Sequence, residues 1–263
     1  MSFLPSIHRR QRCNVLISLS IGAVFFFVWA RLLAYDESFP LVEERNTINT
    51  TIVSSNSIKK DFPQVRPAVN KRRFQSSAVE SLIDEIKKTI KNKELAWLFE
   101  NCFPNTLDTT IDFELRDGSD KKPDTYVITG DIDAMWLRDS SAQVHPYLPL
   151  MTKDPKLRQL IEGVLLRQCF FIQRDPYANA HYKDMNKTSE WKRMDQTEMR
   201  PGVHERKWEL DSLCYVIRLM HSYWKELNKD ATFFQENELE FKKTIHIILQ
   251  TMKEQQRFNG SGK

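Results

Sequence analysis

The sequence predicts an all-α domain that follows a membrane anchor and a stalk. Apolar residues recur at helical spacing in several segments after residue 76. Residues 13–30 contain no charged side chain and are mostly apolar, and residues 36–75 are rich in Ser, Asn, Thr, Lys and Pro without sustained periodicity. The chain therefore divides into a basic tail (1–12), an anchor (13–34), a stalk (35–75) and a globular part (76–263).

The composition excludes some classes of protein. The 39 Lys and Arg residues are scattered among 35 Asp and Glu residues, for a net charge of +4, so the basic stripe of a nucleic-acid-binding protein is missing. The cysteines, at positions 13, 102, 169 and 214, form neither a C-x-x-C motif nor a Cys/His pair at zinc spacing. We therefore expect no structural metal site. A disulfide between two of Cys102, Cys169 and Cys214 stays open, and the sequence does not choose the pair.

The apolar run at 13–30 has about the length that crosses a bilayer. A cleaved signal peptide is the alternative, but its apolar core is shorter and ends at small residues, whereas this run ends in Phe25–Trp29. Basic residues precede the run and only Arg31 follows it closely, so the positive-inside rule predicts a type II membrane protein facing the Golgi or ER lumen. Glycosylation triplets that this topology would expose begin at Asn49, Asn186 and Asn259.

Helical spacing marks four segments of the globular part. The first begins where Ser77 and Glu80 stand at capping-box spacing, and its apolar face continues towards Leu95 and Leu98. Asp154-Pro155 predicts the start of a second helix that reaches about Gln173. The inward residues expected of this helix are Leu157, Leu160, Ile161, Val164, Leu165 and Cys169.

The third helical segment spans 208–228 and the fourth follows a cap at Asp230. The apolar face of the third is expected to contain Leu210, Leu213, Ile217, Met220, Trp224 and Leu227, and that of the fourth Leu239, Ile245, Ile248 and Met252. Residues 126–129 read as a short strand, and residues 175–207 as a long polar loop of the kind that is often functional.

The stretch Gly130–Leu150 has unusual chemistry. Asp133, Trp136, Arg138 and Asp139 interrupt any apolar stripe with groups that are costly to bury unpaired. An aromatic ring beside carboxylates and a guanidinium suits a sugar, because the ring covers the C–H face and the charged groups bond to the hydroxyls. The alternative is a capped helix start in which Arg138 forms a structural ion pair.

A second concentration of charged residues lies at 203–215. Glu209 and Asp211 are two positions apart and cannot share a helix face, so we expect one of them to cap the helix or to pair with Arg206 or Lys207. Asp211 stands one position from the apolar stripe, where burial would raise the pKa of a carboxylic acid as a general acid requires. The alternative is an acidic first turn that favours the helix dipole.

Together, Asp131–Ser140 and Glu205–Tyr215 resemble glycoside hydrolase family 125, the metal-independent exo-α-1,6-mannosidases that include fungal meiotically up-regulated proteins. The similarity runs from about Ser76 to the C-terminus. Two positions depart from the family pattern: Val216 replaces a proline and His204 replaces an aromatic residue.

The resemblance implies an (α/α)6 barrel, inversion of configuration, a mannose-containing glycan as substrate, and neither metal nor cofactor. It implies that Asp211 is the general acid and that the first sugar subsite contains Asp133, Trp136, Arg138 and Asp139.

No residue of this sequence matches the catalytic base of the family. An inverting glycosidase places a second carboxylate about 6.5–9.5 Å from the first to activate water, and in the family this is a distant C-terminal glutamate. We therefore expect this chain to correspond to about the first half of the barrel. Two alternatives remain, a non-catalytic mannan-binding protein and a plain helical scaffold; only the scaffold predicts no sugar binding.

Overall fold

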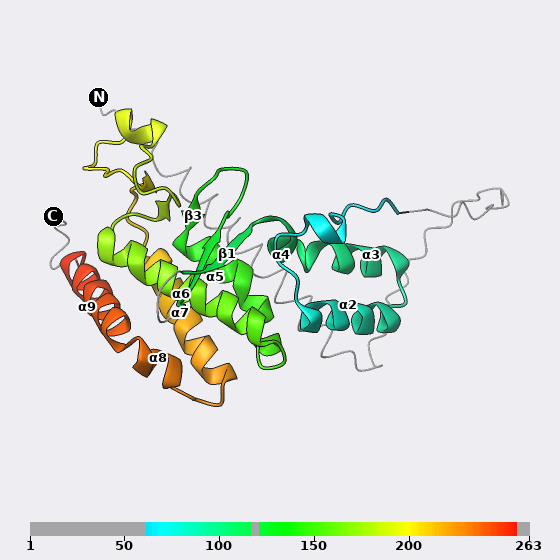
Figure 1. The fold of residues 1–263 in the computed structure, drawn as a ribbon. Coiled ribbons are helices and arrows are strands. Elements are labelled where there is room, and N and C mark those ends of the chain that lie inside the picture. Colours follow the sequence, from blue (N-terminus) through cyan, green and yellow to red (C-terminus); the bar gives the residue numbers. More distant parts are fainter. Residues whose placement is uncertain (1–61, 117–120, 257–263) are drawn as a thin grey trace, which may run out of the picture. The chain divides into compact units, whose positions relative to one another are not determined.

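The computed structural model describes residues 62–116 and 121–256 (Figure 1). The predicted basic tail, the anchor at 13–34 and most of the predicted stalk lie outside these residues, as do Asn49 and Asn259. Within the described ranges, no helix combines the length and the apolar character that crossing a membrane requires.

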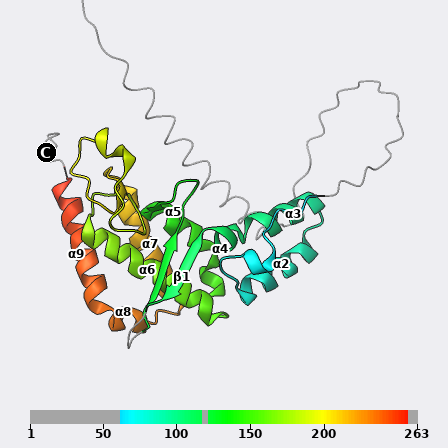
Figure 2. The ribbon, with the colours of Figure 1, turned by 45° about the horizontal axis from the view of Figure 1, so that its top comes forward.

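The folded part is rich in helices, with short strands between them (Figures 1 and 2). The α-helices are α2 (Ser77–Thr89), α3 (Lys93–Cys102), α4 (Asn105–Thr109), α5 (Leu137–Val144), α6 (Pro155–Arg174), α7 (Leu210–Glu226), α8 (Thr232–Glu236) and α9 (Glu238–Glu254). The 3-10 helices are η1 (Val69–Lys71), η2 (His145–Leu150) and η3 (Glu190–Arg193). The strands are β1 (Ile111–Leu115), β2 (Pro123–Val127), β3 (Met135–Trp136), β4 (Ala180–His181) and β5 (Val203–Glu205).

The strands form two small antiparallel sheets that an all-α prediction does not contain. β1 pairs with β2 from Ile111 opposite Val127 to Leu115 opposite Pro123. The strand predicted at 126–129 therefore begins three residues earlier and ends two residues earlier, and it has an unpredicted partner. The second sheet has the order β3-β4-β5. β4, the middle strand, and β5 lie within 175–207, so the segment predicted as a long polar loop is partly ordered as two strands of this sheet.

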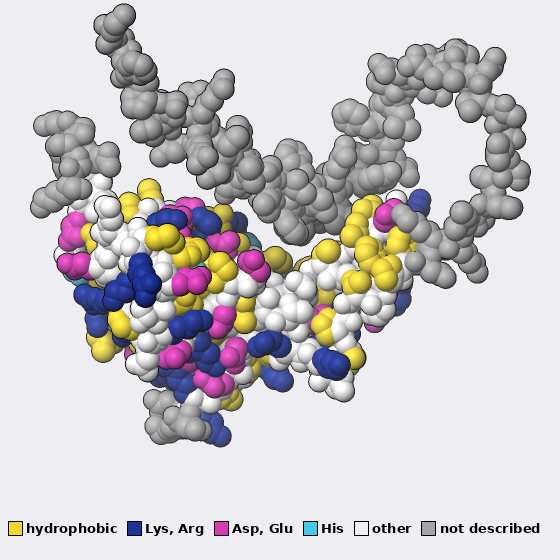
Figure 3. Space-filling model, turned by 90° about the horizontal axis from the view of Figure 1, so that it is seen from above, with side chains coloured by type: hydrophobic (Ala, Val, Ile, Leu, Met, Phe, Trp, Pro, Cys, Tyr) yellow, Lys and Arg dark blue, Asp and Glu magenta, His cyan; other side chains and the backbone are white. Residues whose placement is uncertain are grey.

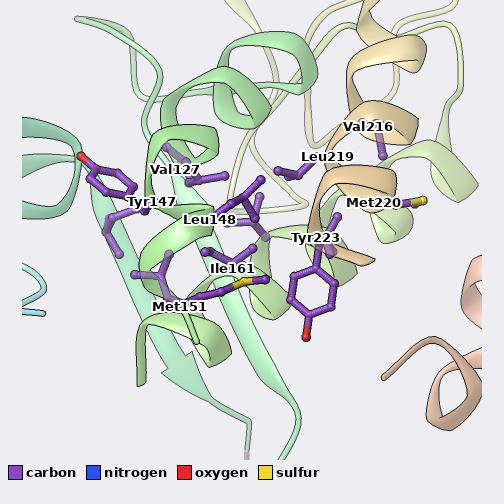
Figure 4. Close-up of a cluster of buried hydrophobic side chains, with 14 of the residues drawn as sticks. Val127, Tyr147, Leu148, Met151, Ile161, Val216, Leu219, Met220 and Tyr223 are labelled. Carbon is purple, nitrogen blue, oxygen red and sulfur yellow. The ribbon is translucent and has the colours of Figure 1, made fainter. Parts of the chain in front are cut away.

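Helix α6 is central to the packing, because β2, α5, α7, α9 and η2 all contact it. The Asp154 carboxylate accepts hydrogen bonds from the amides of Lys156 and Leu157, which confirms the predicted start. All six of the inward residues predicted for this helix are buried. The shared core is drawn in Figure 4, where side chains of β2, η2 and α6 meet those of α7; the labelled residues are Val127, Tyr147, Leu148, Met151, Ile161, Val216, Leu219, Met220 and Tyr223.

A glycine and an ion pair set the distance between α6 and β2. A Cβ atom at Gly163 would lie 2.8 Å from the backbone nitrogen of Thr125 and 2.9 Å from the carbonyl carbon of Asp124, closer than such atoms approach. The hydroxyl of Thr125 donates to the carbonyl of Leu160 at 2.7 Å. Nearby, the guanidinium of Arg167 binds both carboxylate oxygens of the buried Asp124. The helix therefore lies directly on the strand.

The folded part begins before residue 76. Arg66 is buried and forms paired hydrogen bonds to Asp108 and to Glu80, so part of the predicted stalk is packed against α2 and α4. The cap of α2 is Ser76 rather than Ser77, since its hydroxyl oxygen accepts from the amide of Val79. The same hydroxyl donates to Asp154 at 2.5 Å, which joins the beginnings of α2 and α6.

Several predicted inward residues face solvent. On α3 these are Leu95 and Leu98, at the start of α7 Leu210, and on α9 Leu239 and Ile245. The buried side of α7 is rotated towards Ser212, Val216, Leu219 and Tyr223, because it faces both α5 and α6 rather than one neighbour. Apolar side chains gather over the α2–α3 part of the surface in Figure 3, and acidic and basic groups intermix over the rest of that face. Cys102, Cys169 and Cys214 are all free thiols.

Candidate active site

The two chemically unusual stretches of the sequence lie next to each other. The first forms β3, α5 and η2, and the second forms β5 and α7. Helices α5 and α7 pack side by side, and β3 and β5 are the outer strands of one sheet (Figure 1). The fold therefore brings together charged groups that are about seventy residues apart in sequence.

Arg138 is the centre of this cluster. Its guanidinium lies 3.1 Å from Asp211, 3.3 Å from Glu209 and 3.3 Å from Asp139. Partial burial alone would lower the pKa of Arg138, but the charges of Asp139, Asp211 and Glu209 outweigh this and raise it. Three carboxylates thus surround one permanently charged group, and all four side chains are between 30% and 46% exposed, so a ligand can reach them.

Asp211 occupies the first turn of α7 at the edge of its buried face, as the sequence predicts. Its surroundings are not the apolar enclosure that the sequence predicts. The side chain is 46% exposed and its carboxylate is bound to Arg138. A group in this position can meet a glycosidic oxygen from the solvent side of the cluster.

Glu209 stands at the capping position that the sequence offered for one of the two acids, although its side chain bonds to no backbone amide there, and the alternative pairing with Arg206 or Lys207 is wrong. It is the N-cap residue of α7 and has extended backbone angles, so its side chain is not constrained by helical spacing. It reaches the same Nη1 atom of Arg138 as Asp211 does. The cations expected to pair with it bind elsewhere: Arg206 binds Asp175 at 2.8 Å and Lys207 binds Glu205 at 2.5 Å.

Trp136 belongs to a neighbouring cluster around Glu205. The indole nitrogen of Trp136 donates to Glu205 at 3.2 Å, and the amide of Asn179 donates to the same oxygen at 2.6 Å. Burial would raise the pKa of Glu205, but the hydrogen bonds from Lys207, Asn179 and Trp136 lower it. Glu205 is therefore a buried anion that fixes the orientation of the indole ring. Neither Glu205 nor Asn179 was predicted from the sequence to be a site residue. Glu205 is the first residue of the second family-like stretch, whereas no motif includes Asn179.

His204 and two further rings complete this cluster. The His204 ring lies edge-on to Trp136 with centroids 5.2 Å apart, and it is 4.6 Å from Trp191 and 5.1 Å from Tyr182. The hydroxyl of Tyr182 bonds to Nδ1 of His204 at 2.7 Å. Burial lowers the pKa of His204, so the ring is held neutral. This histidine, at a position where the family has an aromatic residue, packs here as an aromatic ring.

Asp133 is not among the groups that bind Arg138. Its carboxylate is 67% exposed and lies 3.6 Å from the ammonium of Lys187. It also borders an open groove, described below, on the side where β1 and β2 lie. Of the four residues predicted to bind sugar, the structure thus unites Arg138 and Asp139, places Trp136 with Glu205, and places Asp133 with Lys187.

Comparisons with known proteins show which family the chain resembles. A family model described as metal-independent alpha-mannosidase (GH125) matches residues 92–263. The meiotically up-regulated gene 157 protein of Schizosaccharomyces pombe is 38% identical over 200 residues, which are 74% of this chain and 38% of the yeast protein.

A solved metal-independent α-mannosidase of Streptococcus pneumoniae, in a non-productive complex with α-1,6-mannobiose, superposes with a TM-score of 0.56 at 36% identity. The alignment covers 66% of this chain and 39% of that one. The chain thus spans well under half the length of both relatives.

Proposed function

Because the chain belongs to the metal-independent α-mannosidases of glycoside hydrolase family 125, we propose that it supplies the general acid and first sugar subsite of an exo-acting, inverting α-1,6-mannosidase with an (α/α)6 barrel. The observation that carries the proposal is the Arg138 cluster, in which Asp139, Glu209 and Asp211 meet one guanidinium. The α-1,6-mannobiose in the Streptococcus pneumoniae structure supports the linkage.

The proposed roles follow from the chemistry of the cluster. Asp211 protonates the glycosidic oxygen, so that the departing sugar leaves as a neutral alcohol. Arg138 and Asp139 bind hydroxyl groups of the terminal mannose as donor and acceptor. Trp136 lies beside them with its indole nitrogen fixed by Glu205, and it limits the space for the sugar ring.

Water must attack the opposite face of the sugar, and the base that activates it is not assigned to a residue of this chain. Glu209 does not suit this role. It and Asp211 bind one nitrogen of Arg138, so the guanidinium occupies the space between them that an inverting pair leaves for water. The base expected from the family is a different carboxylate.

Binding of α-1,6-mannobiose to the purified 263-residue chain, measured by isothermal titration calorimetry, tests the subsite. We expect Arg138→Met to weaken binding at least about tenfold, because it removes a charge-assisted donor worth roughly 1.5–3 kcal/mol. Arg218→Met is the matched control, since Arg218 is exposed on α7. The α-1,6-linked glucose disaccharide, which differs at C2, controls for specificity. Equal affinity of both variants for mannobiose would refute the subsite.

The role of Asp211 is tested by turnover measurements on the enzyme produced from its natural gene. Asp211→Asn keeps the shape of the side chain but cannot donate the proton. We expect turnover of α-1,6-mannobiose to fall by at least about 10², with the affinity changed much less. Unchanged turnover would remove Asp211 from the mechanism, and a chain that binds without hydrolysis would favour the mannan-binding alternative.

A further inference from the structure

A groove of about 500 Å³ includes Asp133, one of the residues predicted to bind sugar. Its walls contain five charged residues and two apolar ones: Arg73, Asp112, Tyr126, Ile128, Asp133, Lys183 and Asp184. They come from the segment before α2, from β1 and β2, from the loop before β3 and from the segment after β4. The volume lies within the range of small-molecule sites.

The chemistry of the groove suits a neutral ligand with many hydroxyl groups. Three carboxylates, of Asp112, Asp133 and Asp184, accompany the two cations Arg73 and Lys183. Such mixed signs disfavour a phosphate or a polycation, because each would meet like charges. Carboxylates accept hydrogen bonds from hydroxyl groups, and ammonium and guanidinium groups donate to them. The half-buried Ile128 adds apolar surface for the C–H groups of a sugar.

A series of contacts connects this groove with Trp136. Asp133 lies 3.6 Å from the ammonium of Lys187, which is 4.1 Å from the ring centroid of Tyr182. The Tyr182 hydroxyl bonds to His204, and the His204 ring packs against Trp136. Asp133 is also only three residues before Trp136 in the chain. The groove and the proposed mannose subsite are therefore built on one framework.

We propose that this groove binds a further hexose of the glycan, on the leaving-group side of the linkage that the enzyme cleaves. The inference rests on the proposed function and adds a binding site to it. It also gives Asp133 a different role from the one expected from sequence: this residue binds the third sugar rather than the terminal mannose. Lys183, which pairs with Asp112 at 2.7 Å, exchanges that partner for sugar hydroxyls.

The test compares α-1,6-mannobiose with α-1,6-mannotriose by calorimetry on the 263-residue chain. We expect the trisaccharide to bind about tenfold more tightly, and Lys183→Met and Asp112→Asn each to remove most of that difference while leaving mannobiose affinity within about twofold. The Lys183–Asp112 pair is exposed, so its loss has little effect on stability. Because the ligand is neutral, the affinity is also expected to be insensitive to salt.

Lys242→Met is the matched control. Lys242 forms an exposed ion pair with Glu238 on α9, as Lys183 does with Asp112, and its replacement is expected to preserve the advantage of the longer glycan. Equal affinity for the two oligosaccharides, or an advantage that both groove variants retain, would overturn the groove while the mannose subsite stands. Failure of every mannoside to bind would instead overturn the proposed function, and the groove assignment with it.

Discussion

At the scale of single residues, the environment of Asp211 places a condition on the proposed mechanism. A general acid carries a proton before it acts, and a protonated Asp211 no longer attracts Arg138 as an ion does. Asp139 and Glu209 remain as anionic partners of the guanidinium in that state. In the proposed mechanism, Asp139 and Glu209 would therefore keep Arg138 in place for the sugar while Asp211 gives up its proton.

The buried His181 is expected to make the stability of the fold depend on pH. Its ring is fully buried in β4 and lies flat against Phe171, with centroids 4.4 Å apart. Burial lowers the pKa of His181 from 6.5 to about 3. Below pH 6.5, His181 therefore becomes protonated in the unfolded chain but stays neutral in the folded protein. The free energy of unfolding consequently falls as the pH falls from 6.5 to 3.

We expect His181 to account for a loss of about 2 kcal/mol between pH 6.5 and pH 5. Burial lowers the pKa values of His145 and His204 as well, so they add to the loss in the same direction. His181→Phe removes the titrating group and keeps an aromatic ring, and it is expected to flatten the dependence of urea unfolding on pH. His246→Gln, at an exposed position of α9, is the control. An equal slope in His181→Phe and the parent would contradict the assignment.

At the scale of elements, the contact between α6 and β2 explains why a glycine occurs inside a long helix. Glycine weakens a helix by roughly 1 kcal/mol relative to alanine, so a packing requirement must compensate. Here the backbone of Asp124 and Thr125 fills the space where a Cβ atom would lie. The buried pair between Arg167 and Asp124 lies one helical turn further along α6.

We expect Gly163→Ala to destabilise the fold by about 1–3 kcal/mol, despite the higher helix propensity of alanine, because the methyl group would push α6 away from β2. The midpoint of urea denaturation measures this change. Gly130→Ala is the matched control, because no atom lies within 4 Å of the Cβ position there. A stability of Gly163→Ala equal to or above that of the parent would show that the helix and the strand can separate without cost.

Sequence periodicity predicted the elements whose pattern is long and local. The 20 residues of α6 show the helical repeat several times over and begin at a clear cap. The strands β3, β4 and β5 contain two or three residues each and pair across long separations, so no repeat exists for a sequence pattern to display. The faces of α7 and α9 were predicted only in part, because a helix that packs on two neighbours buries a wider surface than a single stripe.

Across the molecule, the residues of the candidate site could be predicted from the sequence, whereas the contacts between them could not. Residue types and spacing, together with the family resemblance, selected Trp136, Arg138, Asp139 and Asp211. They could not show that Arg138 binds Glu209 or that Glu205 orients Trp136, because these partners are 71 and 69 residues apart in the chain. Asn179 and Lys187 come from the region predicted as loop, and only the sheet that orders this region brings them to the site.

The hydrogen bond between Ser76 and Asp154 joins the N-terminal ends of α2 and α6, two helices that are far apart in the sequence, and we expect it to couple their opening. Ser76 caps α2 and Asp154 caps α6, and the hydrogen bond from the Ser76 hydroxyl to the Asp154 carboxylate spans 78 positions of the sequence. Amide hydrogen exchange reports such coupling, since helices that open as one unit exchange at linked rates. We expect Ser76→Ala to accelerate exchange about fivefold in α2 and also in the first turn of α6, in line with a loss of about 1 kcal/mol.

Asn92→Ala, which removes a cap that serves α3 alone, is expected to affect only α3. Faster exchange confined to α2 in Ser76→Ala would show that the helices open separately. With such coupling, a change that loosens the start of α2 near residue 76 also loosens α6, the helix against which much of the core packs.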